Sequence, residues 1–173
     1  VLAGPLFGML GATKDNCAAY AALQQDAAFQ RPLNWTTLTS TDFGGLLLPG
    51  GHAKGMRQYL ESTSLQALVR SFFAENQPIG AICHGGVVLA RTQTDSGESV
   101  IAGRRLTALT RSLENTAWLL TAWKLGNYYR TYPTWVETEV REAAGAGGTF
   151  ERGPLQAGYG NPFTVRDGNL LTA

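Results

Sequence analysis

A cysteine and a histidine stand side by side in the segment PIGAICHGGVVLA, residues 78–90. The chain has only two cysteines and two histidines, so this pair contains one of each of the residue types best suited to nucleophilic chemistry. A thiol beside an imidazole supplies both a nucleophile and the base that activates it. Cys83 and His84 are therefore the first candidates for catalysis.

Cys83 follows a short apolar run and precedes two glycines and a second apolar run. This pattern predicts a nucleophile on a tight strand-to-helix turn, where Ala81, Gly85 and Gly86 supply the small neighbours that such a turn needs. The N-terminus of the following helix favours thiolate, so we expect a pKa below the ordinary value of about 8.5 for Cys83. For Cys17, which lies among alanines, we prefer a buried structural role.

A second glycine-rich break, Gly50-Gly51-His52, ends the apolar run of residues 42–51. Because ligands collect at the carboxyl ends of parallel strands, we place these residues at the same rim as Cys83, where His52 either contacts substrate or supports the loop. The two histidines and Cys83 could hold a metal only if they converged, which would consume the nucleophile. We therefore predict no catalytic metal and no other cofactor.

Strands and helices alternate along the chain. Helices are predicted within residues 13–29 (capped by Asp15 or Asn16), 64–76, 87–91, 113–125 (with Trp118 and Leu119 inward) and 136–144. Strands are predicted within residues 42–51 and 79–83, as two short strands joined at Gly103 in residues 99–109, and as a hairpin around Asp167-Gly168. This alternation predicts an α/β fold with a mostly parallel sheet.

Composition excludes several classes of protein. The chain has 173 residues, enough for one domain, and its 14 Lys and Arg residues are scattered with a net charge of +1, which argues against nucleic-acid binding. No apolar run approaches the ~18 residues of a membrane span. The apolar opening VLAGPLFGML has no basic leader, so we do not interpret it as a signal peptide. Two cysteines are too few for a disulfide framework, so we expect a cytoplasmic protein.

Two segments, LLLPGGHAKGMRQYL and QPIGAICHGGVVLA, resemble the ThiJ/PfpI (DJ-one) superfamily. A third, SVIAGRRLTALTRSLENTAW, is similar to the branch that contains heat-shock chaperones and glutathione-independent glyoxalases. The resemblance is close over residues 42–118 and looser elsewhere. It implies a flavodoxin-like three-layer sandwich in a single domain over residues 1–173, with the family's first strand, which carries an acidic partner for the cysteine, and its last helix lying outside this chain.

The resemblance also assigns roles to the site residues. It implies that Cys83 is the nucleophile, that His84 is its partner and that Glu114 orients the histidine. Without the resemblance, Glu114 is better interpreted as a solvated side chain in the first turn of a helix. Gly51 resembles the oxyanion-hole residue, with its N–H group and that of His84 flanking a negative oxygen. Gly50 and His52 belong to the same substrate-binding rim.

Three functions are compatible with this pattern. We favour a thiol enzyme that converts small α-oxoaldehydes such as methylglyoxal into hydroxy acids without glutathione or metal. The alternatives are a thiol hydrolase (a peptidase or amidase) and a holding chaperone or stress sensor in which Cys83 is oxidised. No histidine follows His84, which excludes the glutamine amidotransferase arrangement with a downstream His-x-Glu pair. The expected partners are a small carbonyl substrate and a second copy of the chain in a homodimer.

Aromatic side chains concentrate in the segment WKLGNYYRTYPTWVETEV, residues 123–140. We interpret them as packing the domain or a subunit contact. Lining of the substrate pocket is the second interpretation.

Overall fold

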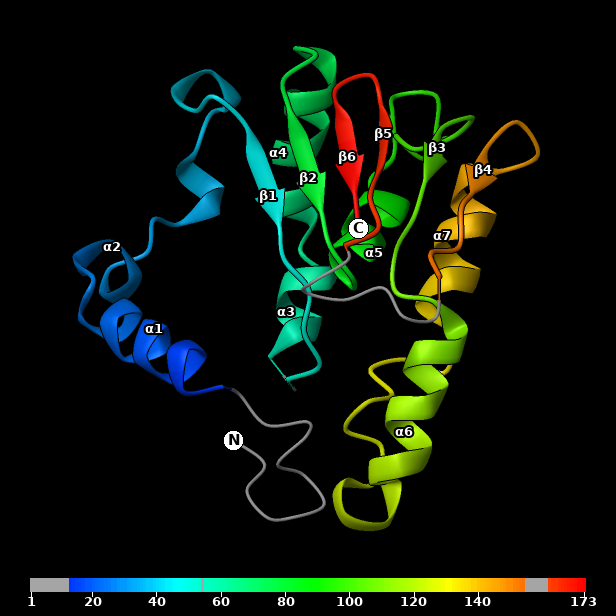
Figure 1. Ribbon diagram of the computed structural model, residues 1–173. Helices are drawn as coiled ribbons and strands as arrows, with labels where there is room; N and C mark the ends of the chain where they lie inside the picture. Colours follow the sequence, from blue (N-terminus) through cyan, green and yellow to red (C-terminus); the bar gives the residue numbers. More distant parts are fainter. Residues whose placement is uncertain (1–12, 54, 155–161) are drawn as a thin grey trace. The chain divides into compact units, whose positions relative to one another are not determined.

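The computed structural model describes residues 13–53, 55–154 and 162–173, and the chain divides into two compact units, residues 1–37 and 38–173 (Figure 1). The apolar opening at residues 1–10 lies outside the described residues. The assignment of residues 1–173 to a single domain stays a prediction. Among the described residues, no helix combines the length and the apolar character that crossing a membrane requires.

The described part of the first unit, residues 13–37, contains two helices and a 3₁₀ turn. These are α1 (Lys14–Gln25), α2 (Ala27–Gln30) and η1 (Trp35–Thr37). The prediction of helix within residues 13–29 is confirmed, but Asp26 interrupts it because its carboxylate accepts the N–H groups of Ala28 and Phe29 and starts α2.

Two predictions in this unit are wrong. Thr13, not Asp15 or Asn16, caps α1, because the N–H of Asn16 lies in the first turn and donates to the Thr13 hydroxyl at 3.2 Å. Cys17 is exposed rather than buried, since no residue of α1 is buried.

The second unit is built on a four-stranded sheet. Its order is β1 (Leu46–Leu48), β2 (Ile79–Ala81), β6 (Leu170–Thr172) and β5 (Val165–Asp167). The first three strands are parallel, and β5 runs antiparallel to β6 in the predicted hairpin. A second, parallel pair joins β3 (Arg105–Leu106) to β4 (Thr149–Phe150). The α/β class and the mostly parallel sheet are thus confirmed.

Helices cover one face of this sheet. In Figure 1, α4 (Thr63–Ala74) lies behind β1 and β2. The helix α5 (Gly85–Arg91) contacts both of these strands and packs against α4 and α7 (Val136–Ala144). The register aligns Leu48, Ala81 and Thr172, which are all buried on the helix side. On the opposite face Leu47 and Leu171 are exposed. The helix α3 (Met56–Leu60) and the 3₁₀ turn η2 (Ser40–Asp42) complete the first half of the unit.

Two expectations in the second half of the unit are wrong. Residues 100–103 form a turn rather than a strand, and Ser99 makes only an isolated antiparallel bridge with Gln93. The Ser99 hydroxyl donates to the Leu89 carbonyl in the last turn of α5, and the Gly103 N–H donates to the Ala144 carbonyl, so these contacts replace strand pairing. In α6 (Arg111–Leu125), Leu119 is 60% exposed rather than inward. The buried residues of α6 are Glu114 and Thr121.

Candidate active site

Cys83 lies just beyond the carboxyl end of β2, in the middle of the sheet. Its N–H donates to the Ala173 carbonyl at 3.0 Å, and the N–H of Ile82 donates to the Leu48 carbonyl at 3.0 Å, so both neighbouring strands fix this position. The φ angle of Cys83 is 56°, in the left-handed region that residues other than glycine rarely adopt. Such strain is typical of functional turns. The predicted strand-to-helix turn is present, and α5 starts at Gly85, two residues before the predicted start at residue 87.

Glycines make this turn possible by leaving room for other backbone atoms. A Cβ atom on Gly85 would lie 2.1 Å from the Leu48 carbonyl oxygen, and one on Gly50 would lie 2.5 Å from the Cβ of Cys83. Both separations are too short for a side chain. The glycines therefore bring the loop after β1 and the start of α5 directly against the cysteine.

His84 is completely buried beside the thiol. Its Nδ1 lies 3.6 Å from Cys83 Sγ, while its Nε2 has no hydrogen-bond partner among the described residues. Burial, reinforced by the charge of nearby His52, lowers the pKa of His84 to about 4. The ring is therefore neutral near pH 7 and can accept a proton from the thiol.

His52 completes a cluster with this pair. Its ring meets that of His84 edge-on at 4.5 Å between centroids and meets Tyr129 at 4.7 Å. Burial lowers the pKa of His52, and its Nδ1 is buried without a hydrogen-bond partner in the described part of the chain. One ligand atom from each of His52, Cys83 and His84 lies within 4.8 Å of the other two. The convergence that a metal site would require is therefore present.

Glu114 is buried in the first turn of α6, which excludes the solvated role. Its carboxylate accepts the N–H of Val136 at the start of α7 at 3.1 Å and lies 3.9 Å from Nη1 of Arg130. Burial raises the pKa of Glu114, and these two contacts oppose the rise. The structure gives no hydrogen bond between Glu114 and His84, so the orienting role stays a prediction.

The environment of the thiol differs from the predicted one. Burial raises the pKa of Cys83, and the negative charge of Glu114 adds to the rise. The backbone N–H groups of His84 and Gly51 hydrogen-bond the sulfur and oppose it. The predicted lowering of this pKa is therefore wrong for these residues, because the loss of solvation outweighs the backbone donors. The same two N–H groups are those expected to form an oxyanion hole.

Two cavities flank the cluster. The larger, about 550 Å³, is lined by His52, Ala53, Arg57, Leu125, Asn127, Tyr128, Arg130 and Thr131. The smaller, about 170 Å³, opens at Cys83 and is lined mostly by Ile82, Thr107, Ala108, Leu109, Leu113 and Phe163. Of the aromatic residues in this segment, Tyr128 lines the larger cavity and Trp135 packs against the Arg130 guanidinium, 3.5 Å from the centre of its ring. The lining of a substrate pocket stays a prediction.

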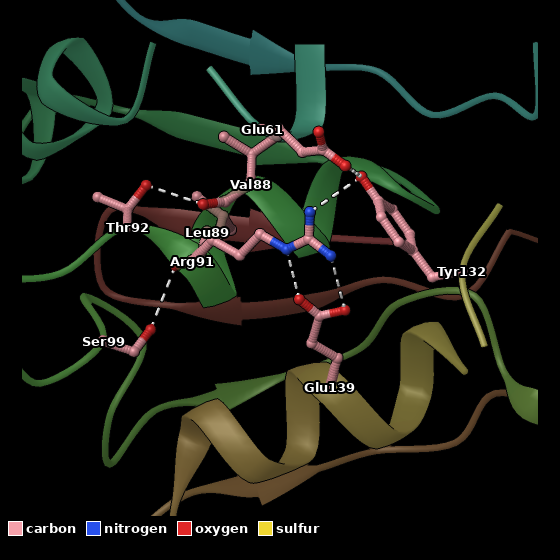
Figure 2. Close-up of polar contacts among 8 residues, drawn as sticks. All are labelled: Glu61, Val88, Leu89, Arg91, Thr92, Ser99, Tyr132 and Glu139. Carbon is pink, nitrogen blue, oxygen red and sulfur yellow. Dashed lines mark hydrogen bonds and ion pairs between the residues drawn. The ribbon is translucent and has the colours of Figure 1, made fainter. Parts of the chain in front are cut away.

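The sequence pattern did not indicate any role for the arginines of this region. Figure 2 shows Arg91, at the end of α5, donating to both carboxylate oxygens of Glu139 on α7, at 2.6 and 3.2 Å. Arg91 also donates to the Tyr132 hydroxyl at 3.0 Å, and that hydroxyl donates to Glu61 at 2.7 Å. This network ties the helix that follows Cys83 to α7 and to the segment that lines the larger cavity. Scattered arginines in the sequence give no signal of such pairing.

The sequence of the chain is similar to that of a known protein family and its members. The family model described as ThiJ/PfpI family-like matches residues 1–146. The glutathione-independent glyoxalase hsp3102 of Schizosaccharomyces pombe is 29% identical over 141 residues, which are 78% of this chain and 52% of the relative. The probable glutathione-independent glyoxalase hsp3103 of the same organism is 30% identical over 126 residues, or 71% of this chain and 44% of the relative.

A solved structure shares the fold. The crystal structure of glyoxalase III from Candida albicans superposes with a TM-score of 0.68 and 21% identity, covering 92% of this chain and 63% of that one. The chain thus spans about half the length of the two curated relatives.

Proposed function

Because this chain belongs to the ThiJ/PfpI family, we propose that it is a glutathione-independent glyoxalase that converts small α-oxoaldehydes into 2-hydroxy acids through a covalent adduct on Cys83. The observation that carries the proposal is Cys83 itself. It sits at φ 56° beyond the end of β2, with a neutral imidazole nitrogen 3.6 Å from its sulfur. The names of the two fission-yeast relatives give the reaction class.

The first step forms the adduct. His84 takes the thiol proton, Cys83 Sγ bonds to the aldehyde carbon, and the aldehyde oxygen becomes an oxyanion. The backbone N–H groups of Gly51 and His84, which hydrogen-bond the sulfur in the free protein, would donate to that oxygen until it is protonated. The product is a hemithioacetal.

The next steps move a proton and release the acid. A base removes the hydrogen from the carbon bound to sulfur, the freed electron pair forms a carbon–carbon double bond, and the ketone oxygen takes up a proton, which gives an enediol. Protonation of the neighbouring carbon and loss of the hydroxyl proton from the carbon bound to sulfur then leave a thioester. Water then adds to the thioester, the carbon–sulfur bond breaks, and the hydroxy acid leaves with the thiol restored. One carbon is oxidised and its neighbour reduced, so no external oxidant or cofactor is needed.

His84 is the residue best placed to shuttle this proton, and His52 borders the larger cavity where substrate would enter. Glu114 is proposed to stabilise the site indirectly, through Val136 and Arg130. The homodimer and the cytoplasmic location stay predictions.

The proposal is tested with methylglyoxal in the absence of glutathione, following loss of substrate and formation of lactate. Cys83→Ala is expected to lower the turnover by ~10³-fold or more, because it removes the thiol that bonds to the aldehyde carbon beside His84. His84→Ala should lose ~10²-fold or more, as for removal of a general base, and Glu114→Gln should lose less. Cys17→Ala, which removes the other cysteine, is the matched control and should retain full activity.

The same assay separates the alternatives. Lactate formation that persists in Cys83→Ala would rule out the mechanism. Cleavage of peptides or amides without lactate formation would favour the thiol hydrolase. Suppression of client-protein aggregation that survives Cys83→Ala would favour the chaperone.

A further inference from the structure

We propose that His52, Cys83 and His84 form a binding site for one zinc-class divalent cation, and that the bound metal inhibits the enzyme. The binding stands on the geometry of the cluster alone. Its inhibitory effect rests on the function proposed above. The starting observation is that one ligand atom of each residue lies within 4.8 Å of the other two.

The distances suit a tetrahedral metal. Zn–S and Zn–N bonds of about 2.3 and 2.05 Å at the tetrahedral angle place the sulfur and nitrogen about 3.6 Å apart. Cys83 Sγ and His84 Nδ1 are 3.6 Å apart, so two of the three ligands already have this spacing. His52 belongs to the glycine-rich loop after β1, and its ligand nitrogen lies at most 4.8 Å from the other two ligand atoms. Bringing this nitrogen to the tetrahedral spacing of about 3.5 Å requires a movement of about 1 Å.

To bind metal, Nδ1 of His84 exchanges its contact with the Cys83 thiol for a bond to the cation, whereas Nδ1 of His52 has no hydrogen bond to give up. Nδ1 of His52 and Nε2 of His84 are buried and have no hydrogen-bond partner within the described residues. A buried nitrogen without a partner is uncommon in a native protein and usually indicates an unseen water or ion. Coordination of the cation through Nδ1 of His52 would satisfy one of them.

The donor set selects the kind of metal. One thiolate and two imidazoles favour borderline and soft cations such as Zn²⁺ and disfavour Mg²⁺ and Ca²⁺, which take oxygen ligands. Three protein ligands leave one tetrahedral position for water. The buried carboxylate of Glu114 adds negative charge near the sulfur, and Arg130, 3.9 Å from that carboxylate, offsets part of it.

Metal binding and thiol catalysis exclude each other. The cation displaces the thiol proton to solvent, and the sulfur lone pair that would attack the aldehyde becomes the metal–sulfur bond. Inhibition should therefore be complete at one equivalent of metal and reversed by a chelator.

The binding is tested on the Cys17→Ala protein, which leaves Cys83 as the only thiol. Titration with Zn²⁺ alone should show one site per chain and release of protons, and Co²⁺ as a probe should give a thiolate-to-cobalt charge-transfer band with the visible spectrum of tetrahedral cobalt. His52→Ala should weaken Zn²⁺ binding by at least the ~10–100-fold that loss of an outer-shell partner costs. The variant's circular dichroism should match that of its parent, because His52 lies on a partly exposed loop.

The outcomes are separable from those of the glyoxalase assay. Absence of the charge-transfer band, or Zn²⁺ affinity unchanged in both His52→Ala and Cys83→Ala, would overturn the metal site whether or not the protein makes lactate. Stoichiometric binding through Cys83 without any lactate formation would refute the proposed function and leave the metal site standing. Turnover that continues with one bound Zn²⁺ would overturn the inhibitory role.

Discussion

At the scale of single residues, the chemistry of the site depends on how burial changes the acidity of its side chains. Burial raises the pKa of Cys83 and lowers that of His84, so both changes favour the uncharged thiol–imidazole pair over thiolate and imidazolium. The two side chains nonetheless lie 3.6 Å apart, where a proton can pass between them. In the proposed mechanism the thiol is therefore activated when substrate binds and does not stand as a free thiolate beforehand.

The raised pKa of Cys83 predicts slow alkylation near neutral pH. Because only the thiolate reacts, the rate with iodoacetamide should keep rising with pH beyond the value typical of an unperturbed thiol. Exposed Cys17 is the internal control and should react faster at pH 7. Peptide mass spectrometry measures both rates in one sample. A Cys83 rate that levels off well below pH 8 would contradict this prediction and restore the sequence-based one.

The lowered pKa of His84 predicts a specific loss of stability in acid. Its folded-state pKa of about 4 lies below the unfolded value of 6.5, so the unfolded chain binds the proton more readily and stability falls as pH drops from 6.5 towards 4. The loss attributable to His84 is about 3 kcal/mol at most. Urea unfolding of the wild type and of His84→Gln at several pH values measures it, and equal slopes of stability against pH would refute it.

At the scale of elements, the turn that holds Cys83 depends on the absence of a side chain at Gly85. Gly85→Ala would place a methyl group 2.1 Å from the Leu48 carbonyl oxygen, so β1 and α5 must move apart. We expect a loss of about 3 kcal/mol or more in the free energy of unfolding, together with loss of activity.

Gly44→Ala is the matched control for this variant. A Cβ atom at Gly44 meets nothing within 4 Å, so its effect should stay below about 1 kcal/mol. Denaturant unfolding of both variants measures the change in the free energy of unfolding that each substitution causes. Similar small changes in the two would mean that the start of α5 is less tightly packed than the structure indicates.

Local patterns predicted most of the elements, because their residues satisfy local and tertiary demands at once. The helical spacing of Leu65, Leu68, Val69 and Phe72 marks the buried face of α4, and the turn at Gly168 closes the β5–β6 hairpin. The apolar residues Val100 and Ile101 suggested a strand, but they are buried in a turn that is tied to α5 by the hydrogen bond from the Ser99 hydroxyl to the Leu89 carbonyl.

The candidate site was predictable only where residue types are rare. Cys83, His84 and His52 could be identified because the chain has few alternatives. Arg91 and Arg130 could not, since their roles come from contacts with residues far away in the sequence. The pKa of Cys83 was predicted in the wrong direction because burial depends on the packing of elements that the local motif does not contain.

At the scale of the whole molecule, the two units differ in how they are stabilised. The buried apolar residues among those described run from Leu48 to Leu170 and therefore all belong to the second unit. The helices α1 and α2 bury no residue, and they are held by their caps at Thr13 and Asp26. The candidate site also lies entirely within the second unit.

This division predicts that residues 38–173 fold by themselves. Since burial of apolar surface is the main source of stability, removing residues 1–37 should change the free energy of unfolding by less than about 1 kcal/mol. The denaturant slope m should also change little, because it follows the surface exposed on unfolding and the helices of the first unit are already exposed. Urea unfolding of residues 38–173, followed by tryptophan fluorescence and compared with that of the whole chain, measures both quantities. A fall of several kcal/mol, or loss of the cooperative transition, would show that the first unit stabilises the second.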